Sequence, residues 1–320
     1  MTVPARHWLA GLAVAALVLA LSWDRVQALL GPERIVLAQA LATGLLQGGV
    51  YALSAMGLTL IFGVLGIINF GHGALVSVGL YLCWSISSGF GVDPYLSLLL
   101  VGAATFLIGM LLYRALLAPS LNQPHENQLL LTLAIAIVIE NGLKLAFSAT
   151  PRFVQSPMAT TDLRILGLST PAAWVIAFAG SLAVAGLLHL LLSRTLLGAS
   201  IRAVASNRTG AMLVGIDVGR IYTLVFGLGA ACVGATAVLV APVVPIEPVA
   251  GERFTIVAFV VVVLGGLGSV AGAFIGGLLV GFAQELGGVL FPSQSKLLAV
   301  FVVFLCVLFL RPQGLLGKAR

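Results

Sequence analysis

The chain of 320 residues is 60% hydrophobic and only 8% charged, and its mean hydropathy is +1.16. Because about a quarter of the residues in a soluble domain are charged, this composition excludes a water-soluble globular protein. It indicates a polytopic membrane protein of the all-α class, since no stretch alternates with the roughly ten-residue period of a transmembrane barrel strand.

The predicted elements are apolar segments long enough to cross a bilayer, which takes about 20 residues of helix. In chain order we expect about ten spanning helices, over residues 8–22, 36–62, 73–90, 95–117, 128–148, 172–193, 222–241, 254–271, 273–291 and 297–310. The first is short and follows Arg6 and His7, so it is either a retained N-terminal anchor, which we favour, or a signal peptide. No linker or soluble insertion interrupts the series, so residues 1–320 are expected to form a single membrane domain.

The basic side chains are distributed unevenly between the two sides of this predicted topology. With the N-terminus in the cytoplasm, nine Lys and Arg residues fall inside and six outside, while Lys144 is left within a span. Cytoplasmic loops carry the excess of Lys and Arg in membrane proteins, so we expect both termini in the cytoplasm. The isoelectric point near 9.7 then reflects this asymmetry, and no nucleic-acid partner is expected.

Charged residues inside the predicted spans are candidates for a transport pathway, because a charge at the bilayer centre is costly unless it is paired. Glu140 and Lys144 are four residues apart on one span, in the order that favours a pair on a helix. We expect them to neutralise each other, with a pathway role as the alternative. Glu285 has no obvious partner in the neighbouring sequence.

Glycines four residues apart lie on one face of a helix and let helices approach closely in lipid. Three sets have this spacing, and we expect them to form helix-packing faces or a sliding gate between helices: Gly44 and Gly48, Gly277 and Gly281, and Gly268, Gly272 and Gly276. Gln47 and Tyr51 share the face of the first set, so they either line a polar path or hydrogen-bond across helices.

The stretch GVLGIINFGHGALVSVG, residues 63–79, carries Asn69 and His72 among several glycines. The topology puts it at the cytoplasmic side, between the second and third spans. Buried polar groups are costly unless they are paired, so we expect both side chains to satisfy backbone groups of a broken helix, with a role in the substrate path as the alternative. The histidines are scattered and the cysteines far apart, so neither a metal site nor a disulfide is expected.

The largest predicted cytoplasmic loop, residues 194–220, contains a short helix with clear end signals. Asn207 is a favourable N-cap, and Gly215 is favourable just after a helix C-terminus. Residues 208–214 between them make about two helical turns.

The segment ALSAMGLTLIFG, residues 52–63, followed by INFGHG, residues 68–73, resembles the permease subunits of ABC importers for branched-chain amino acids. It is similar to the paralogue that carries Asn-Phe-x-His-Gly. The runs VVLGGLGSVAGAFIGGLLVGFAQELGG and FLRPQGLLG near the C-terminus resemble the same subunits, and the resemblance extends from about residue 36 to 317. Segment 8–22 looks like an addition to the shorter family members.

The resemblance implies a permease rather than an enzyme, in a bacterial inner membrane, for branched-chain amino acids, urea, amides or small organic acids. It implies a homologous second permease, two cytoplasmic ATPases that bind ATP and Mg²⁺, an extracytoplasmic binding protein and no cofactor on this chain. The sequence agrees, because it has no phosphate-binding loop: its only Gly-Lys, Gly317-Lys318, is followed by Ala319.

Segment 198–217 resembles the coupling region of this family, in which a short helix contacts the ATPase. ABC importers in general carry Glu-Ala-Ala-x3-Gly there, whereas here only Ala211 and Gly215 match. Met212 and Leu213 would supply an apolar knob for an ATPase cleft. Arg202 and Arg208 would pair with acids on the ATPase or with anionic lipid, and the N-cap Asn207 belongs to the same coupling segment. The alternative is a plain amphipathic interfacial helix.

A different class of function is an ion-gradient-driven transporter or channel. Its pathway would use Glu140, Lys144, Glu285 and His72, since ionisable groups inside a membrane often mark ion paths. An intramembrane enzyme is not favoured, because the chain has neither His-Glu-x-x-His nor Gly-x-Ser-x-Gly.

Overall fold

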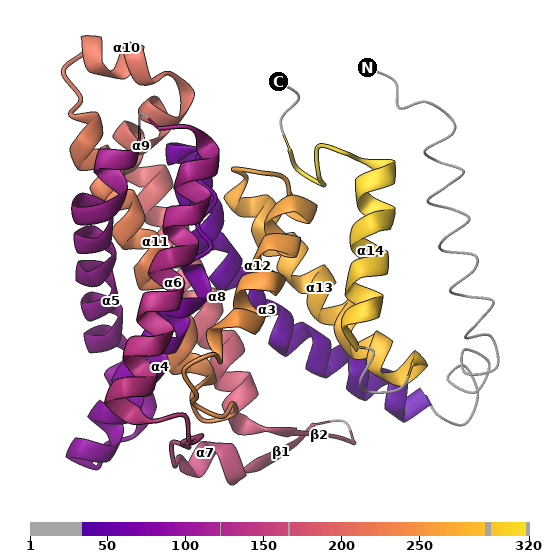
Figure 1. Cartoon of the computed structure of the whole chain (residues 1–320). Helices are drawn as coiled ribbons and strands as arrows, with labels where there is room; N and C mark the ends of the chain where they lie inside the picture. Colours follow the sequence, from indigo (N-terminus) through magenta and orange to yellow (C-terminus); the bar gives the residue numbers. More distant parts are fainter. Residues whose placement is uncertain (1–33, 122, 166, 292–295, 318–320) are drawn as a thin grey trace.

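The computed structural model describes residues 34–121, 123–165, 167–291 and 296–317 as a bundle of helices (Figure 1). The predicted span 8–22 lies outside these residues. Within them, the longer helices are α3 (Arg34–Leu65), α4 (His72–Phe90), α5 (Leu98–Leu112), α6 (His125–Phe147), α8 (Ala172–Arg194), α11 (Val218–Val240), α12 (Gly251–Gly265), α13 (Val270–Leu290) and α14 (Lys296–Leu310).

Seven helical segments of the described chain are long and apolar enough to cross a membrane: α3, α4, α6, α8, α11, α13 and the run Pro94–Ser120 that includes α5. Nine of the ten predicted spans fall within the described residues, two more than these seven. Helices α12 and α14 have 15 residues each, fewer than the roughly 20 needed for a full crossing. The span predicted at 254–271 ends early because Gly266 and Gly268 both take positive φ angles and stop the helix.

Short elements connect the helices. They are η1 (Pro94–Ser97), η2 (Tyr113–Leu117), η3 (Ala118–Ser120), α7 (Pro157–Thr160), β1 (Asp162–Ile165), β2 (Leu168–Pro171), α9 (Leu196–Ser206) and α10 (Arg208–Leu213). Strands β1 and β2 form an antiparallel hairpin in which Leu163 pairs with Thr170, a small departure from the predicted all-α fold. Figure 1 shows α7 and this hairpin at one end of the bundle, the hairpin end, and α10 with the last turn of α14 at the opposite, α10 end.

The core of the bundle is built around α3 and α11, which bury 15 of 32 and 18 of 23 residues respectively. Helices α5, α6 and α8 lie outside them and turn large apolar side chains outward. Leu99, Val138 and Leu187, one on each of these helices, are 84%, 72% and 66% exposed. Such surfaces suit a hydrocarbon solvent, so the outer sides of these helices fit the bilayer.

Helices α3 and α13 approach each other through glycines. A Cβ atom added at Gly44 would lie 2.9 Å from the carbonyl oxygen of Gly281, and one at Gly48 would lie 2.9 Å from the Cα atom of Leu278. Side chains at these positions would collide with backbone rather than with flexible groups. The close approach of the two helices therefore depends on the absence of side chains.

The predicted glycine face of Gly268, Gly272 and Gly276 is only partly a helix face. Gly272 and Gly276 lie on α13 and pack against the backbone of Gly265 in α12. Gly268 precedes α13, with a φ of +85°, and its Cα atom faces Gly63 at the end of α3. The prediction that Gly268 stacks with the other two on one helix face is wrong, because the turn after α12 intervenes.

Candidate functional site

The segment between α3 and α4 is non-helical and lies against other helices. Two of its backbone N–H groups donate to side chains. The Asn69 Oδ1 atom accepts a hydrogen bond from the backbone N–H of Gly71 at 3.0 Å, and the N–H of Phe70 donates to the Thr132 hydroxyl of α6 at 3.2 Å. Asn69 is 2% exposed, and its Nδ2 atom has no hydrogen-bond partner among the described residues.

His72 fixes the depth at which α4 begins. Its Nε2 atom lies 3.2 Å from the Oγ atom of Ser54 in α3, which precedes the end of that helix by 11 residues. At a rise of 1.5 Å per residue, this is about 16 Å of helix. The sequence topology put the segment at the cytoplasmic end, whereas α4 begins well below the end of α3. Non-helical backbone at such depth is tolerated where protein buries it, and Ile67, Asn69 and Gly71 of this connection are buried, whereas Gly66, Ile68 and Phe70 are exposed.

Helix α12 begins beside α4 at the same place. The backbone N–H of Gly251 donates to the Ser77 hydroxyl at 3.0 Å, and the backbones of Gly73 and Gly251 touch. Two helix N-termini therefore lie together inside the bundle.

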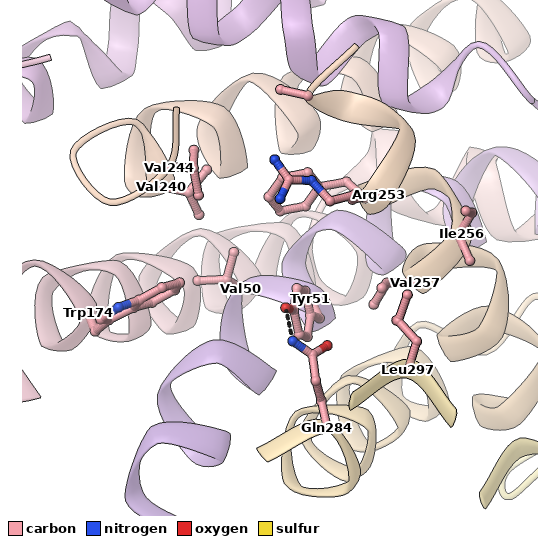
Figure 2. Close-up of a pocket in the computed structure, with 12 residues that line it drawn as sticks. Val50, Tyr51, Trp174, Val240, Val244, Arg253, Ile256, Val257, Gln284 and Leu297 are labelled. Carbon is pink, nitrogen blue, oxygen red and sulfur yellow. Dashed lines mark hydrogen bonds between the residues drawn. The ribbon is translucent and has the colours of Figure 1, made fainter. Parts of the chain in front are cut away.

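A cavity of about 220 Å³ lies between α3, α8, α11, α12, α13 and the first turn of α14 (Figure 2). Tyr51 lines it, and its hydroxyl oxygen accepts a hydrogen bond from the Gln284 Nε2 atom of α13 at 3.0 Å. Arg253, from the first turn of α12, extends over the cavity from another side (Figure 2). Gln47 precedes Tyr51 by one turn and is half-buried, and its side chain makes no hydrogen bond within the described chain.

The charged residues predicted inside the spans are arranged differently from the expectation. Glu285 does have a partner: the Lys296 Nζ atom at the start of α14 lies 3.2 Å from its carboxylate, in an ion pair that closes α13 against α14. Sequence reasoning missed it because the two residues belong to different helices.

Glu140 and Lys144 do not form the predicted pair. The described residues contain three ion pairs, between Arg220 and Asp217, between Arg253 and Glu247 and between Lys296 and Glu285. Lys144 is exposed on the outer surface of α6 and Glu140 is half-buried. A shared helix face allows such a pair but does not force it, because long side chains can extend toward other surroundings.

The short helix in the loop predicted to be cytoplasmic has the expected end residues. The Asn207 Oδ1 atom accepts from the N–H of Gly210 at 2.9 Å, and Gly215 takes a φ of +84° after the last turn. Ala211 faces inward and is buried, whereas Met212 and Leu213 are 49% and 84% exposed. The helix thus presents two apolar side chains at the extreme α10 end of the bundle (Figure 1).

The two arginines of this region differ in their surroundings. The guanidinium of Arg208 lies over the ring of Tyr222 in α11, 5.7 Å from its centroid, so it holds α10 against a core helix. Arg202 is exposed on α9 and borders a second cavity with His189.

The chain matches the sequence profile of a known protein family. The sequence profile of the family described as branched-chain amino acid transport system / permease component matches residues 40–310. The chain belongs to this family. No solved structure matches it.

Three relatives align with most of this permease and over most of their own length. The high-affinity branched-chain amino acid transport system permease protein BraD of Pseudomonas aeruginosa is 31% identical over 300 residues, which is 90% of this chain and 98% of the relative. LivH of Escherichia coli K12 is 29% identical, and the match covers 88% of this chain and 95% of the relative. The probable LivH of Methanocaldococcus jannaschii is 28% identical, and the match covers 83% of this chain and 88% of the relative.

Sequence reasoning missed part of the polar cavity of this permease. Gln284 and Arg253 line it beside Tyr51, although only Tyr51 was a candidate. A polar residue inside an apolar span was the available signal for Gln284. The sequence contained no such signal for Arg253, because an arginine near the start of a helix cannot be told apart from an ordinary loop residue.

Proposed function

We propose that the chain is the membrane-spanning subunit of an ATP-driven importer for branched-chain amino acids or related small polar solutes such as urea, amides and small organic acids. The names of the relatives support the solute class, since each describes branched-chain amino acid transport. Relatives in Pseudomonas and Escherichia support a bacterial inner membrane. The excess of arginine near the α10 end supports an orientation with this end in the cytoplasm.

The observation that carries the ATP-driven part of the proposal is the apolar tip of α10. Met212, Leu213 and the following Val214 are all exposed, although they lie at the end of the bundle rather than on its lipid-facing flank. A capped helix that holds apolar side chains outward is suited to docking in a protein cleft. We assign that cleft to one of two cytoplasmic ATPases, which bind ATP and Mg²⁺, because this sequence has no phosphate-binding loop.

Contacts within the chain offer a route from α10 to the membrane helices. Arg208 stacks over Tyr222 of α11, and the Asp217 carboxylate caps the start of α11 by accepting from the N–H of Arg220 at 3.0 Å. Since α11 is a core helix, a push on α10 is passed to the centre of the bundle. In the proposed cycle, ATP binding opens the pathway outward, an extracytoplasmic binding protein releases its solute between this chain and a homologous second permease, and hydrolysis restores the inward-open state.

The alternative of an ion-gradient-driven transporter receives less support from these contacts. Glu285 is neutralised by Lys296, and Lys144 faces outward from the bundle. An ion path would need titratable groups that face one another inside the bundle.

The test is uptake by the native host together with purification of the chain. Uptake of radiolabelled leucine, isoleucine, valine and urea is compared between the host and a strain that lacks the chain. The tagged chain is then purified from native membranes in mild detergent, and the co-purifying proteins are identified by mass spectrometry.

We expect loss of amino-acid or urea uptake in the deletion strain, and co-purification of an ATPase and a second permease. Unchanged uptake of all four solutes would refute the solute assignment. A chain that purifies alone and moves solute in liposomes along an ion gradient would replace the ATP-driven reading with the gradient-driven one.

A further inference from the structure

We propose that the cavity bordered by Tyr51, Arg253 and Gln284 holds a single branched-chain amino acid as it passes through this subunit. The inference rests on the proposed function and deepens it by naming the groups that contact the solute. Arg253 and the Tyr51 hydroxyl would bind the carboxylate, Gln284 would bind the ammonium group, and the apolar wall would take the side chain.

The size and wall of the cavity fit a small amphiphilic solute. Its volume of about 220 Å³ is below the roughly 300–1,000 Å³ of sites for larger ligands. Most of the wall is aliphatic, contributed by Val50, Val240, Val244, Ile256, Val257 and Leu297. Figure 2 shows these side chains around the space between Arg253 and the Tyr51–Gln284 pair. A branched aliphatic group is the natural complement of such a wall.

One polar atom in this wall lacks a partner. The Gln284 amide donates from Nε2 to the Tyr51 hydroxyl at 3.0 Å, whereas its Oε1 atom is buried without a hydrogen bond in the described chain. A buried acceptor without a donor is unfavourable. An ammonium group, which has three N–H donors and no acceptor, would satisfy Oε1 after a small rotation of the amide. Since Tyr51 accepts from Gln284, its own O–H is available to donate to a carboxylate.

Arg253 supplies positive charge on another side of the cavity. Its Nη2 atom lies 3.6 Å from the Glu247 carboxylate, the one ion pair it forms among the described residues, and the guanidinium has five N–H donors in all. Arg253 belongs to the first turn of α12, where the helix dipole also favours an anion. A carboxylate placed here would make charge-assisted hydrogen bonds, which are stronger than neutral ones.

The cavity lies toward the hairpin end of the bundle. Val244 and Ala250 line it and belong to the α11–α12 connection, in which Ile246 pairs with Arg152 of the α6–α7 connection. In the proposed orientation this is the extracytoplasmic side, where a binding protein delivers its solute. In this orientation the cavity lies between the extracytoplasmic surface and the part of the core that contains the non-helical α3–α4 connection.

The test measures binding of tritiated L-leucine to the tagged full chain, purified from the native host with its co-purifying partners and placed in lipid nanodiscs without binding protein. Arg253→Gln removes the charge, Arg253→Lys keeps it, and Gln284→Met removes the amide. Arg164→Gln, in the exposed hairpin, is the matched control. Leucinamide, which lacks the carboxylate, is tested as a competitor.

We expect Arg253→Gln and Gln284→Met to weaken leucine binding about ten- to hundred-fold, as for loss of a hydrogen bond to a charged group. Arg253→Lys should retain part of the affinity, and Arg164→Gln all of it. Leucinamide should displace leucine poorly from the wild-type chain. From Arg253→Gln it should displace leucine as well as unlabelled leucine does. Comparable yields and unfolding temperatures of the variants exclude misfolding as the cause.

Two outcomes would overturn the inference while the proposed function stands. One is wild-type affinity in both Arg253→Gln and Gln284→Met. The other is a preparation that does not bind leucine, although the deletion strain has lost leucine uptake. If the deletion strain takes up all four solutes normally, the proposed solute class fails and the inference fails with it.

Discussion

The imidazole of His72 is hydrogen-bonded to α3 at Ser54, where its Nε2 atom lies 3.2 Å from Oγ and 3.1 Å from the carbonyl oxygen. This contact joins the first residue of α4 to the middle of the most extensively packed helix. Together with the hydrogen bonds between the α3–α4 connection and Thr132, it holds the start of α4 below the end of α3.

Replacing His72 with alanine should destabilise the permease by about 2 kcal/mol or more, because the change removes a buried hydrogen bond and leaves a cavity at a fully buried site. The measurement is the thermal unfolding temperature of the purified chain in detergent. His189→Ala is the control, since His189 is exposed on α8. Equal unfolding temperatures for the two variants would show that the His72 contact is dispensable.

Gly281→Ala should separate α3 from α13. The added methyl group would meet the backbone of Gly44 and Gly48, which cannot move aside as a side chain could. Overpacking of this kind costs about 1–3 kcal/mol. Gly186→Ala on α8 is the matched control, because nothing lies within 4 Å of the added methyl group there. Thermal unfolding in detergent compares the two, and an unchanged Gly281→Ala would contradict the close α3–α13 packing.

The positions of the helices followed largely from the sequence, because apolar runs and their end residues are local signals. Residues 73–90 were predicted as a span, and α4 covers His72–Phe90. The start of α11 was placed at residue 222 instead of Val218, because the N-cap Asp217 was counted only as a loop charge. The β1–β2 hairpin was missed, since four-residue strands carry no clear alternation.

The arrangement of the polar groups was much harder to predict. Tyr51 was a candidate because it is polar within a span, but its partner Gln284 lies 233 residues further along the chain. Lys296, the partner of Glu285, was assigned to a loop. Such contacts depend on which helices pack together and at what depth, and one sequence contains no periodic signal for that pairing.

Lys296→Met should destabilise the junction of α13 and α14. Glu285 would be left as an uncompensated carboxylate whose side chain is only 13% exposed. Breaking a fully buried pair costs about 3–5 kcal/mol and an exposed pair about 0–1, so we expect about 1–3 kcal/mol here. The double variant Lys296→Met with Glu285→Gln should recover most of this loss in thermal unfolding. If the double variant is no more stable than Lys296→Met alone, the ion pair does not explain the loss.

Replacing Met212 and Leu213 together with glutamate should uncouple transport from ATP hydrolysis. Both side chains are exposed at the tip of α10, so the folded chain should tolerate the change, whereas an apolar cleft on an ATPase would have to bury two charges. We expect at least a ten-fold loss of solute uptake in the native host, with normal amounts of the permease in the membrane. Co-purification of the ATPase in mild detergent should fall in parallel.

The matched control for this prediction is Leu196→Glu, which places a charge at an equally exposed apolar residue near the same end of the bundle but outside α10. It should retain uptake and the ATPase. Normal uptake in the Met212 and Leu213 double variant would exclude α10 as the coupling element. Equal losses in the variant and the control would instead point to a general effect of charge at the membrane surface, because a docking knob requires that only the tip of α10 be sensitive.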